Sequence, residues 1–395
     1  MVTNQVCCVW FAQTVRASGG ATSGSFSCGG AAGTVYILNG TSSSLIFDNS
    51  DGTSASSTLT PFPPDLNGVL LSQLNISGKA YVDLRQSKQN NDVRASVLDL
   101  DQNSKVTGDS VVIDTSNATI RGQILATTAV WLHNAQSGPG RVKAFSGSSI
   151  TCTSGLFKMS LEGSDVELQG SISATNTEVK GLRSFSHTGS MIASGSHLII
   201  MAETATISGL VKCTGAACSS LVSVNQTLEL GGSLGCTNGK CTLSVRSGGD
   251  ITVTGTISSS MTGTISCSRY KILVLGTITC ISALCPIALE GGQIEVGKFG
   301  IVQGGDVIMK GDRITVQGAI SATGQGYGGL AGSGKGSKPS WGGSHSYFRV
   351  AGSGAGHGGD GADGCYRSSY GTLPSGTIGL YIKHVGAYGL GGESG

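Results

Sequence analysis

The residues best suited to chemistry in this sequence are its cysteines, 12 in a chain of 395 residues. Cys213 and Cys218 bracket one six-residue loop (CTGAAC), and Cys236 and Cys241 bracket another (CTNGKC). Such loops suit small disulfides at turns, although CxxxxC pairs can also bind zinc. Structural zinc sites favour CxxC pairs, which this sequence lacks, so we expect disulfides and an oxidising, extracytoplasmic compartment. The disulfide candidates, none of them expected to bind metal, are Cys7, Cys8, Cys28, Cys152, Cys213, Cys218, Cys236, Cys241, Cys267, Cys280, Cys285 and Cys365.

Two further motifs resemble ligand sites without completing them. The segment GLAGSGKG lacks the hydroxyl residue that should follow Lys335 in a phosphate-binding loop, because Gly336 stands there. Asp99 and Asp101 resemble the start of a calcium loop, but Ser104 replaces its glycine. We therefore expect no cofactor and interpret both segments as turns or loops.

The acidic residues do not form a catalytic pattern in the sequence. Glycoside hydrolases need two carboxylates at a fixed separation, and polysaccharide lyases need a calcium cluster and a base. Asp165 and Glu167 share a strand and a face, which we interpret as a solvated outward face. No Asp-Asp pair or ligand-like histidine spacing occurs. We predict no catalytic residues and no enzymatic activity.

The elements that position these residues repeat with a regular period. A glycine recurs about every 22 residues between short segments rich in Val, Ile and Thr, as in DITVTGTISS. Such a period is typical of solenoids, and period-two alternation places apolar residues on one face. We predict an all-β parallel β-helix with almost no α-helix, in preference to a β-sandwich. The anchors, expected at bends that need positive φ or close backbone approach, are Gly122, Gly147, Gly170, Gly189, Gly209, Gly231, Gly255, Gly276, Gly297 and Gly318.

The two ends of the chain differ from the repeat. Residues 1–65 are predicted to form a β cap or small β-domain, residues 66–322 the β-helix, and residues 323–395 a glycine-rich loop with a terminal strand that makes subunit contacts. The aromatic and histidine residues of this last segment are unusual for a flexible linker. The interface candidates are Tyr327, Trp341, Tyr347, Phe348 and His357.

The composition excludes some classes of binding partner. The net charge is +2 and only 12% of residues are charged, with no basic block, so we expect no nucleic-acid partner. No apolar run reaches 18 residues, so we expect no membrane span. The N-terminus lacks the charged region of a signal peptide, and we expect the sequence to be part of a longer precursor. The candidate sites of covalent glycans in N-x-S/T motifs are Asn39, Asn75, Asn117 and Asn225.

The segment GSGAGHGGDGADGCYRSSYGTLPSGTIG resembles a pattern in large secreted proteins of algae, oomycetes and other protists. Its matching residues are Gly354, Gly356, His357, Gly358, Gly359, Gly361, Tyr370, Gly371, Pro374 and Gly376. Some of those proteins look like components of mastigonemes, the tubular hairs of flagella. The resemblance covers about 30 residues of motif and implies a β-helix with a surface or filament role.

From these observations we expect an extracellular structural protein that assembles with copies of itself through non-closing contacts. An adhesin or carbohydrate-binding module is the alternative expectation, and a polysaccharide lyase or hydrolase is a third.

Overall fold

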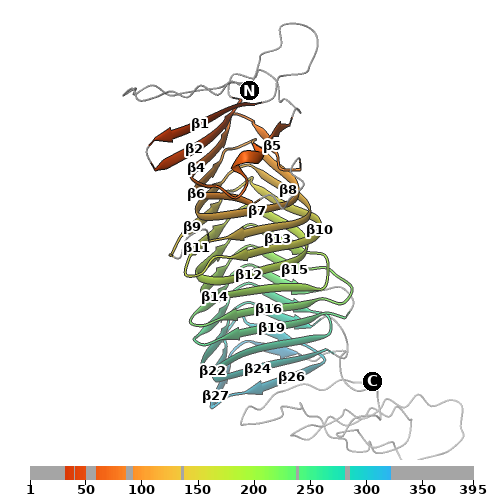
Figure 1. Cartoon of the computed structure of the whole chain (residues 1–395). Coiled ribbons are helices and arrows are strands. Elements are labelled where there is room, and N and C mark those ends of the chain that lie inside the picture. The colour runs from red at the N-terminus through yellow and green to blue at the C-terminus, as the bar shows by residue number, and fades with distance from the viewer. Residues whose placement is uncertain are drawn as a thin grey trace, which may run out of the picture.

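The chain folds into a parallel β-solenoid of about 11 turns with about 22 residues per turn, as the sequence predicts. A computed structural model describes residues 32–39, 41–49, 59–85, 92–134, 138–236, 240–280 and 285–321. These residues form one continuous sheet that winds into a rod (Figure 1). A single 3-10 turn, η1 (Pro64–Leu66), is the only helical element among them.

One turn near the middle shows how the solenoid is built. It consists of β16 (Ser219–Val224), β17 (Leu228–Leu230) and β18 (Ser233–Cys236), and corners separate the three strands. Each strand pairs in parallel with its counterpart in the next turn, which is β19 (Thr242–Ser247), β20 (Ile251–Val253) or β21 (Thr256–Ser259). Three strands per turn give the rod three outward faces.

The other turns repeat this plan, and several strands run through a corner without interruption. Before β16 lie β1 (Gly33–Asn39), β2 (Ser42–Asp48), β3 (Thr60–Pro61), β4 (Leu70–Ser77), β5 (Tyr81–Asp83), β6 (Asp92–Leu100), β7 (Lys105–Ile120), β8 (Gln123–His133), β9 (Arg141–Ala144), β10 (Ser149–Ser160), β11 (Asp165–Leu168), β12 (Ser171–His187), β13 (Ser190–Ala193), β14 (His197–Ile207) and β15 (Leu210–Cys213). After β21 lie β22 (Thr262–Val274), β23 (Thr277–Cys280), β24 (Pro286–Val296), β25 (Ile301–Gln303), β26 (Asp306–Lys310), β27 (Arg313–Val316) and β28 (Ala319–Ser321).

The core is a set of apolar columns along the rod axis. In a strand, alternate side chains point to opposite faces, so every second residue of each turn points inward. One column contains Val222, Val245 and Ile265, which are neighbours in register, and all three are almost fully buried. Each turn therefore buries its apolar residues only against its neighbours, which is the physical basis of the repeat.

The glycine period corresponds to one crowded corner. Gly209, Gly232, Gly255 and Gly276 stack in register on successive turns there. A Cβ atom on each of the last three would overlap the carbonyl oxygen of the glycine one turn before it. Close backbone approach is therefore the reason for this column, and none of its members has a positive φ.

Three of the predicted anchors lie beside this column instead of in it. Ser148, Gly232 and Gly300 occupy the column in place of Gly147, Gly231 and Gly297. Gly147 instead has a positive φ of 87° with open space around it. The period is correct, but these individual positions are not.

The solenoid begins earlier in the chain than residue 66. β2 pairs in parallel with β4, and β3 pairs in parallel with β5, so residues of the predicted cap already belong to the first turn. β1 is different, because it pairs antiparallel with β2 and forms a hairpin at this end of the rod (Figure 1). The predicted C-terminal segment lies outside the described residues from residue 322 onward.

Candidate functional surfaces

Three disulfides close the same corner of the rod. Each joins the end of one turn to the start of the next across five positions: Cys213–Cys218, Cys236–Cys241 and Cys280–Cys285. Their first cysteines share one inward column, in which Ser259 stands between Cys236 and Cys280. The short-loop pairing predicted for the first two loops is therefore present, and the third loop follows the same rule.

Stacking brings sulfur atoms of two successive loops together. The Sγ atoms of Cys218, Cys236 and Cys241 lie within 4.8 Å of one another. The Sγ atom of Cys236 also lies 3.8 Å from the carbonyl oxygen of Cys218 and 3.6 Å from that of Thr242. Carbonyl oxygens repel a thiolate, which is the form that binds zinc. This environment favours disulfides over a zinc–thiolate site.

Two other cysteines are buried free thiols, in contrast to their status as disulfide candidates. Cys152 lies in the same inward column as the first disulfide cysteines, in register with Ala126 and Ala174. Cys267 lies on a different strand, between Ser247 and Gly291. Because the register gives each of them no cysteine neighbour among the described strands, neither can pair there. Burial raises the pKa of both thiols, so they remain protonated.

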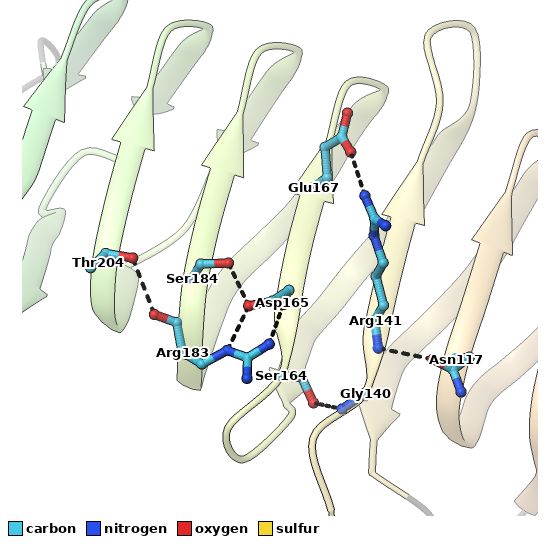
Figure 2. Close-up of polar contacts among 9 residues, drawn as sticks. All are labelled: Asn117, Gly140, Arg141, Ser164, Asp165, Glu167, Arg183, Ser184 and Thr204. Atoms are coloured by element: carbon cyan, nitrogen blue, oxygen red, sulfur yellow. Dashed lines mark hydrogen bonds and ion pairs between the residues drawn. The ribbon is translucent and has the colours of Figure 1, made fainter.

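Charged side chains gather on one outward face, which we call the charged face. Its strands include β9, β11, the end of β12 and the end of β14, and it contains Arg141, Lys143, Asp165, Glu167 and Arg183. Figure 2 shows that acids and bases alternate from turn to turn there. Arg183 donates to both carboxylate oxygens of Asp165 through its Nε and Nη2 atoms, and Lys143 Nζ lies 3.0 Å from Glu167 Oε2. The opposite charges therefore neutralise one another along the rod.

Neutral polar side chains complete this ladder. Ser184 donates a hydrogen bond of 2.7 Å to Asp165, and Thr204 donates one of 3.2 Å to the carbonyl oxygen of Arg183. On the other side, Asn117 accepts from the backbone N–H of Arg141 at 3.2 Å (Figure 2). Together with the ion pairs, these contacts connect five successive turns and fix the outward side chains.

The pairing determines the charge state of the two acids. The hydrogen bond from Arg183 lowers the pKa of Asp165, and that from Lys143 lowers the pKa of Glu167. Both are therefore ionised near neutral pH, whereas a general acid needs a raised pKa. The outward solvated face inferred from the sequence is in fact an ion-paired face.

A second outward face is almost free of charge, and we call it the hydroxyl face. From the turn of β10 onward it consists of the starts of β10 and β12 followed by β13, β15, β18, β21, β23, β25 and β28, and we use the name for this part only, because the earlier turns of the same face carry Lys105. Most of its outward side chains are serines and threonines, and Lys212 is the only charged one. The outward positions are Ser149, Thr151, Ser171, Ser173, Ser190, Ile192, Leu210, Lys212, Ser233, Gly235, Thr256, Ser258, Thr277, Thr279, Ile301, Gln303, Ala319 and Ser321. At about 4.8 Å per turn this face is roughly 40 Å long.

The histidine best placed to titrate inside the rod is His187. It is fully buried, stacks on Phe185 with ring centroids 6.1 Å apart, and its Nε2 atom lies 3.2 Å from the carbonyl oxygen of Leu210. Burial lowers its pKa, so the ring is neutral and Nε2–H donates to that carbonyl. His187 therefore has a structural role in the core.

The glycosylation candidates that can be placed avoid the hydroxyl face. Asn75 and Asn117 point outward on the charged face, and Asn225 is exposed at the corner between β16 and β17. Asn39 ends β1. The remaining predicted residues lie outside the described part of the chain, namely Cys7, Cys8, Cys28 and Cys365 and the interface candidates Tyr327, Trp341, Tyr347, Phe348 and His357.

Comparison with known proteins identified no relative of this chain. No protein-family model, curated protein or solved structure matched the chain. Within the described residues, no helix is long and apolar enough to cross a membrane.

Proposed function

We propose that this protein is a structural subunit of an extracellular filament or cell-surface appendage that grows by self-association. The observation that carries the proposal is the hydroxyl face, with Lys212 as its only charged side chain over roughly 40 Å. Burying such a surface against a second copy strips water from few charges. Its hydroxyls can exchange hydrogen bonds with water for hydrogen bonds with the partner, which keeps the cost of desolvation low. The other two faces carry many charged side chains, among them Arg141 and Lys158.

The repeat explains why contacts between copies need not produce a closed ring or dimer. Turns follow one another at about 4.8 Å with similar side chains, so two copies can pair with an offset of several turns. An offset pair leaves part of each hydroxyl face open to a third copy, which produces an open assembly. A face about 13 Å wide contributes roughly 500 Å² per partner, near the lower limit for a specific pair. Single pairs should be weak, and assembly should depend on many contacts.

Three other features agree with an extracellular setting. Three disulfides staple the rod, and such bonds persist in oxidising compartments. The described N-x-S/T sites lie away from the hydroxyl face, so glycans there would leave this face free. The likeness of residues 352–379 to secreted filament proteins of protists, including mastigoneme components, agrees with this setting.

The test is electron microscopy of the oxidised, full-length protein together with light scattering. We expect filaments or elongated oligomers. The double variant Thr256→Lys/Thr279→Lys adds charge to the hydroxyl face and should reduce assembly. The matched control Thr206→Lys/Thr252→Lys adds the same charge to the charged face and should assemble normally. Dispersed monomers of the wild-type protein at high concentration would contradict the proposal.

A further inference from the structure

Two of the three disulfides lie on successive turns and share one cluster of sulfur atoms. Cys213 and Cys236 are neighbours in register, so the Cys213–Cys218 loop lies directly beside the Cys236–Cys241 loop. The Sγ atoms of Cys218, Cys236 and Cys241 lie within 4.8 Å of one another, and all three residues are buried. Disulfides exchange when a thiolate attacks a sulfur of an existing disulfide bond. Cys218 is therefore placed beside both sulfur atoms of the next disulfide.

The third disulfide, Cys280–Cys285, lies at the same corner without such a neighbour among the described residues. Ser259 occupies the column between Cys236 and Cys280, so two turns of about 4.8 Å each separate these two cysteines. The sulfur cluster includes neither Cys280 nor Cys285. Disulfides of equal loop length therefore occur in this rod both with and without a neighbouring sulfur, which provides an internal comparison.

We propose that this cluster is a site of thiol–disulfide exchange, in which Cys218 attacks Cys236 after an external dithiol has opened the Cys213–Cys218 bond. In the first step the dithiol is oxidised to its disulfide, and Cys213 and Cys218 are reduced to thiols. In the second step Cys218 loses its proton and bonds to Cys236 Sγ. The Cys236–Cys241 bond breaks, and Cys241 takes the electron pair and a proton. The second step is redox-neutral, and it does not rest on the filament proposal.

The surroundings of Cys236 give the direction of this attack. Its Sγ atom lies 3.8 Å from the carbonyl oxygen of Cys218 and 3.6 Å from that of Thr242. These oxygens disfavour negative charge on Cys236, and a sulfur that holds negative charge poorly is a poor leaving group. Cys236 is therefore the sulfur that is attacked, and Cys241 is the one that leaves.

The exchange changes which part of the rod the disulfide encloses. Cys218 directly precedes β16 and Cys236 ends β18, so a bond between them closes one whole turn into a ring. The bond that it replaces closes only a six-residue corner loop. A longer closed loop restricts the unfolded chain more strongly. Loss of one disulfide therefore moves the next one from a corner to a complete turn.

Non-reducing peptide mapping of the full-length protein, with free thiols trapped by alkylation, tests the site. The variant Cys213→Ser leaves Cys218 without its partner, so no external dithiol is needed. We expect Cys218–Cys236 as its main pair in this cluster, with Cys241 alkylated. Brief treatment of the wild type with dithiothreitol should give the same pair, which keeps the test valid if the variant fails to fold. The rate of its formation should rise about tenfold per pH unit below the thiol pKa, because the thiolate is the nucleophile.

The matched control is Cys280→Ser, which leaves Cys285 without its partner in the loop that has no neighbouring sulfur. Cys285 should be alkylated in this variant, and the other two disulfides should keep their pairing. Equal shuffling in this control would overturn the proposal, because exchange would then not depend on the cluster.

The wild type and Cys213→Ser decide the remaining outcomes. The proposal is wrong if Cys236–Cys241 stays intact in both experiments while Cys218 is fully alkylated. A main product that joins Cys218 to Cys241 would overturn the assigned direction of attack.

Discussion

Two adjacent glycines provide the sharpest test of the solenoid register. An alanine Cβ at Gly232 would overlap the carbonyl oxygen of Gly209 in the preceding turn. At Gly231, the nearest atoms to such a Cβ are the hydroxyl oxygens of Ser208 at 3.4 Å and Thr254 at 3.5 Å. Neither glycine has a positive φ. The two substitutions therefore differ only in the space available to one methyl group.

The expected magnitudes follow from the contacts. To accept Gly232→Ala the two turns must separate locally, which strains packing by about 1–3 kcal/mol. The separation also weakens two hydrogen bonds, from Gly232 N to Ile207 O at 2.9 Å and from Ser233 N to Gly209 O at 3.0 Å. At about 1 kcal/mol each, these bring the expected loss to about 3–5 kcal/mol. Gly231→Ala should be neutral or stabilise by up to about 1 kcal/mol, because alanine has fewer unfolded conformations.

Urea unfolding followed by circular dichroism measures the difference in the free energy of unfolding between the two variants. Hydrogen exchange of the peptides around β17 and β18 shows where the loss falls, because each turn of a solenoid contacts only its neighbours. We expect faster exchange at this corner in Gly232→Ala alone. Equal unfolding midpoints for the two variants would refute the glycine column and the register that defines it.

Three further predictions concern the disulfides and the titrating groups. Replacing Cys236 and Cys241 together with alanine should destabilise the protein by about 2 kcal/mol, the loop-closure entropy of a six-residue loop, and non-reducing peptide mapping should find all three adjacent pairs in the wild type. Asp165→Asn should lower the melting temperature slightly at pH 7, and the difference should shrink as the pH falls below the ordinary Asp pKa of about 3.9 and vanish once it passes the lowered pKa of Asp165, where the carboxylate loses its charge. His187 has a lowered pKa, so the unfolded state binds its proton first, and the wild type should lose stability between roughly pH 7 and pH 5, whereas His187→Phe should lose less over that range in thermal melts.

The sequence was sufficient for the fold because the fold is a local repeat. Alternation of apolar residues with period two and a glycine about every 22 residues each follow directly from the geometry of a turn. The exact glycine positions were harder to predict. Where two glycines are adjacent, as at Gly231 and Gly232, only the pairing with Gly209 shows which one meets the neighbouring carbonyl oxygen.

The residues that make up each outward face were harder to predict from the sequence, because they depend on the register between strands. In β7 the inward positions change from Val106 to Val111 and Ile113, because a register shift lies between Gly108 and Ser110 in its pairing with β8. Such an irregularity breaks any count of alternate residues along the strand. The proximity of Trp131 in β8 to Lys158 in β10 likewise depends on the pairing of these two strands, which are separated by a corner and a full turn. The only local signal was an aromatic residue inside an otherwise regular strand.

The disulfide corner shows how the same position is stabilised by different chemistry from turn to turn. Ser259 occupies the column of Cys236 and Cys280, and its buried hydroxyl donates a hydrogen bond of 2.8 Å to the carbonyl oxygen of Thr262. This contact spans a shorter corner than the disulfides, so a hydrogen bond bridges it where a six-residue loop needs a covalent link. Every such bridge joins residues that are close in sequence. The order of the rod along its axis therefore depends on sheet pairing and stacked apolar columns, and reduction should loosen single corners while the register between turns persists.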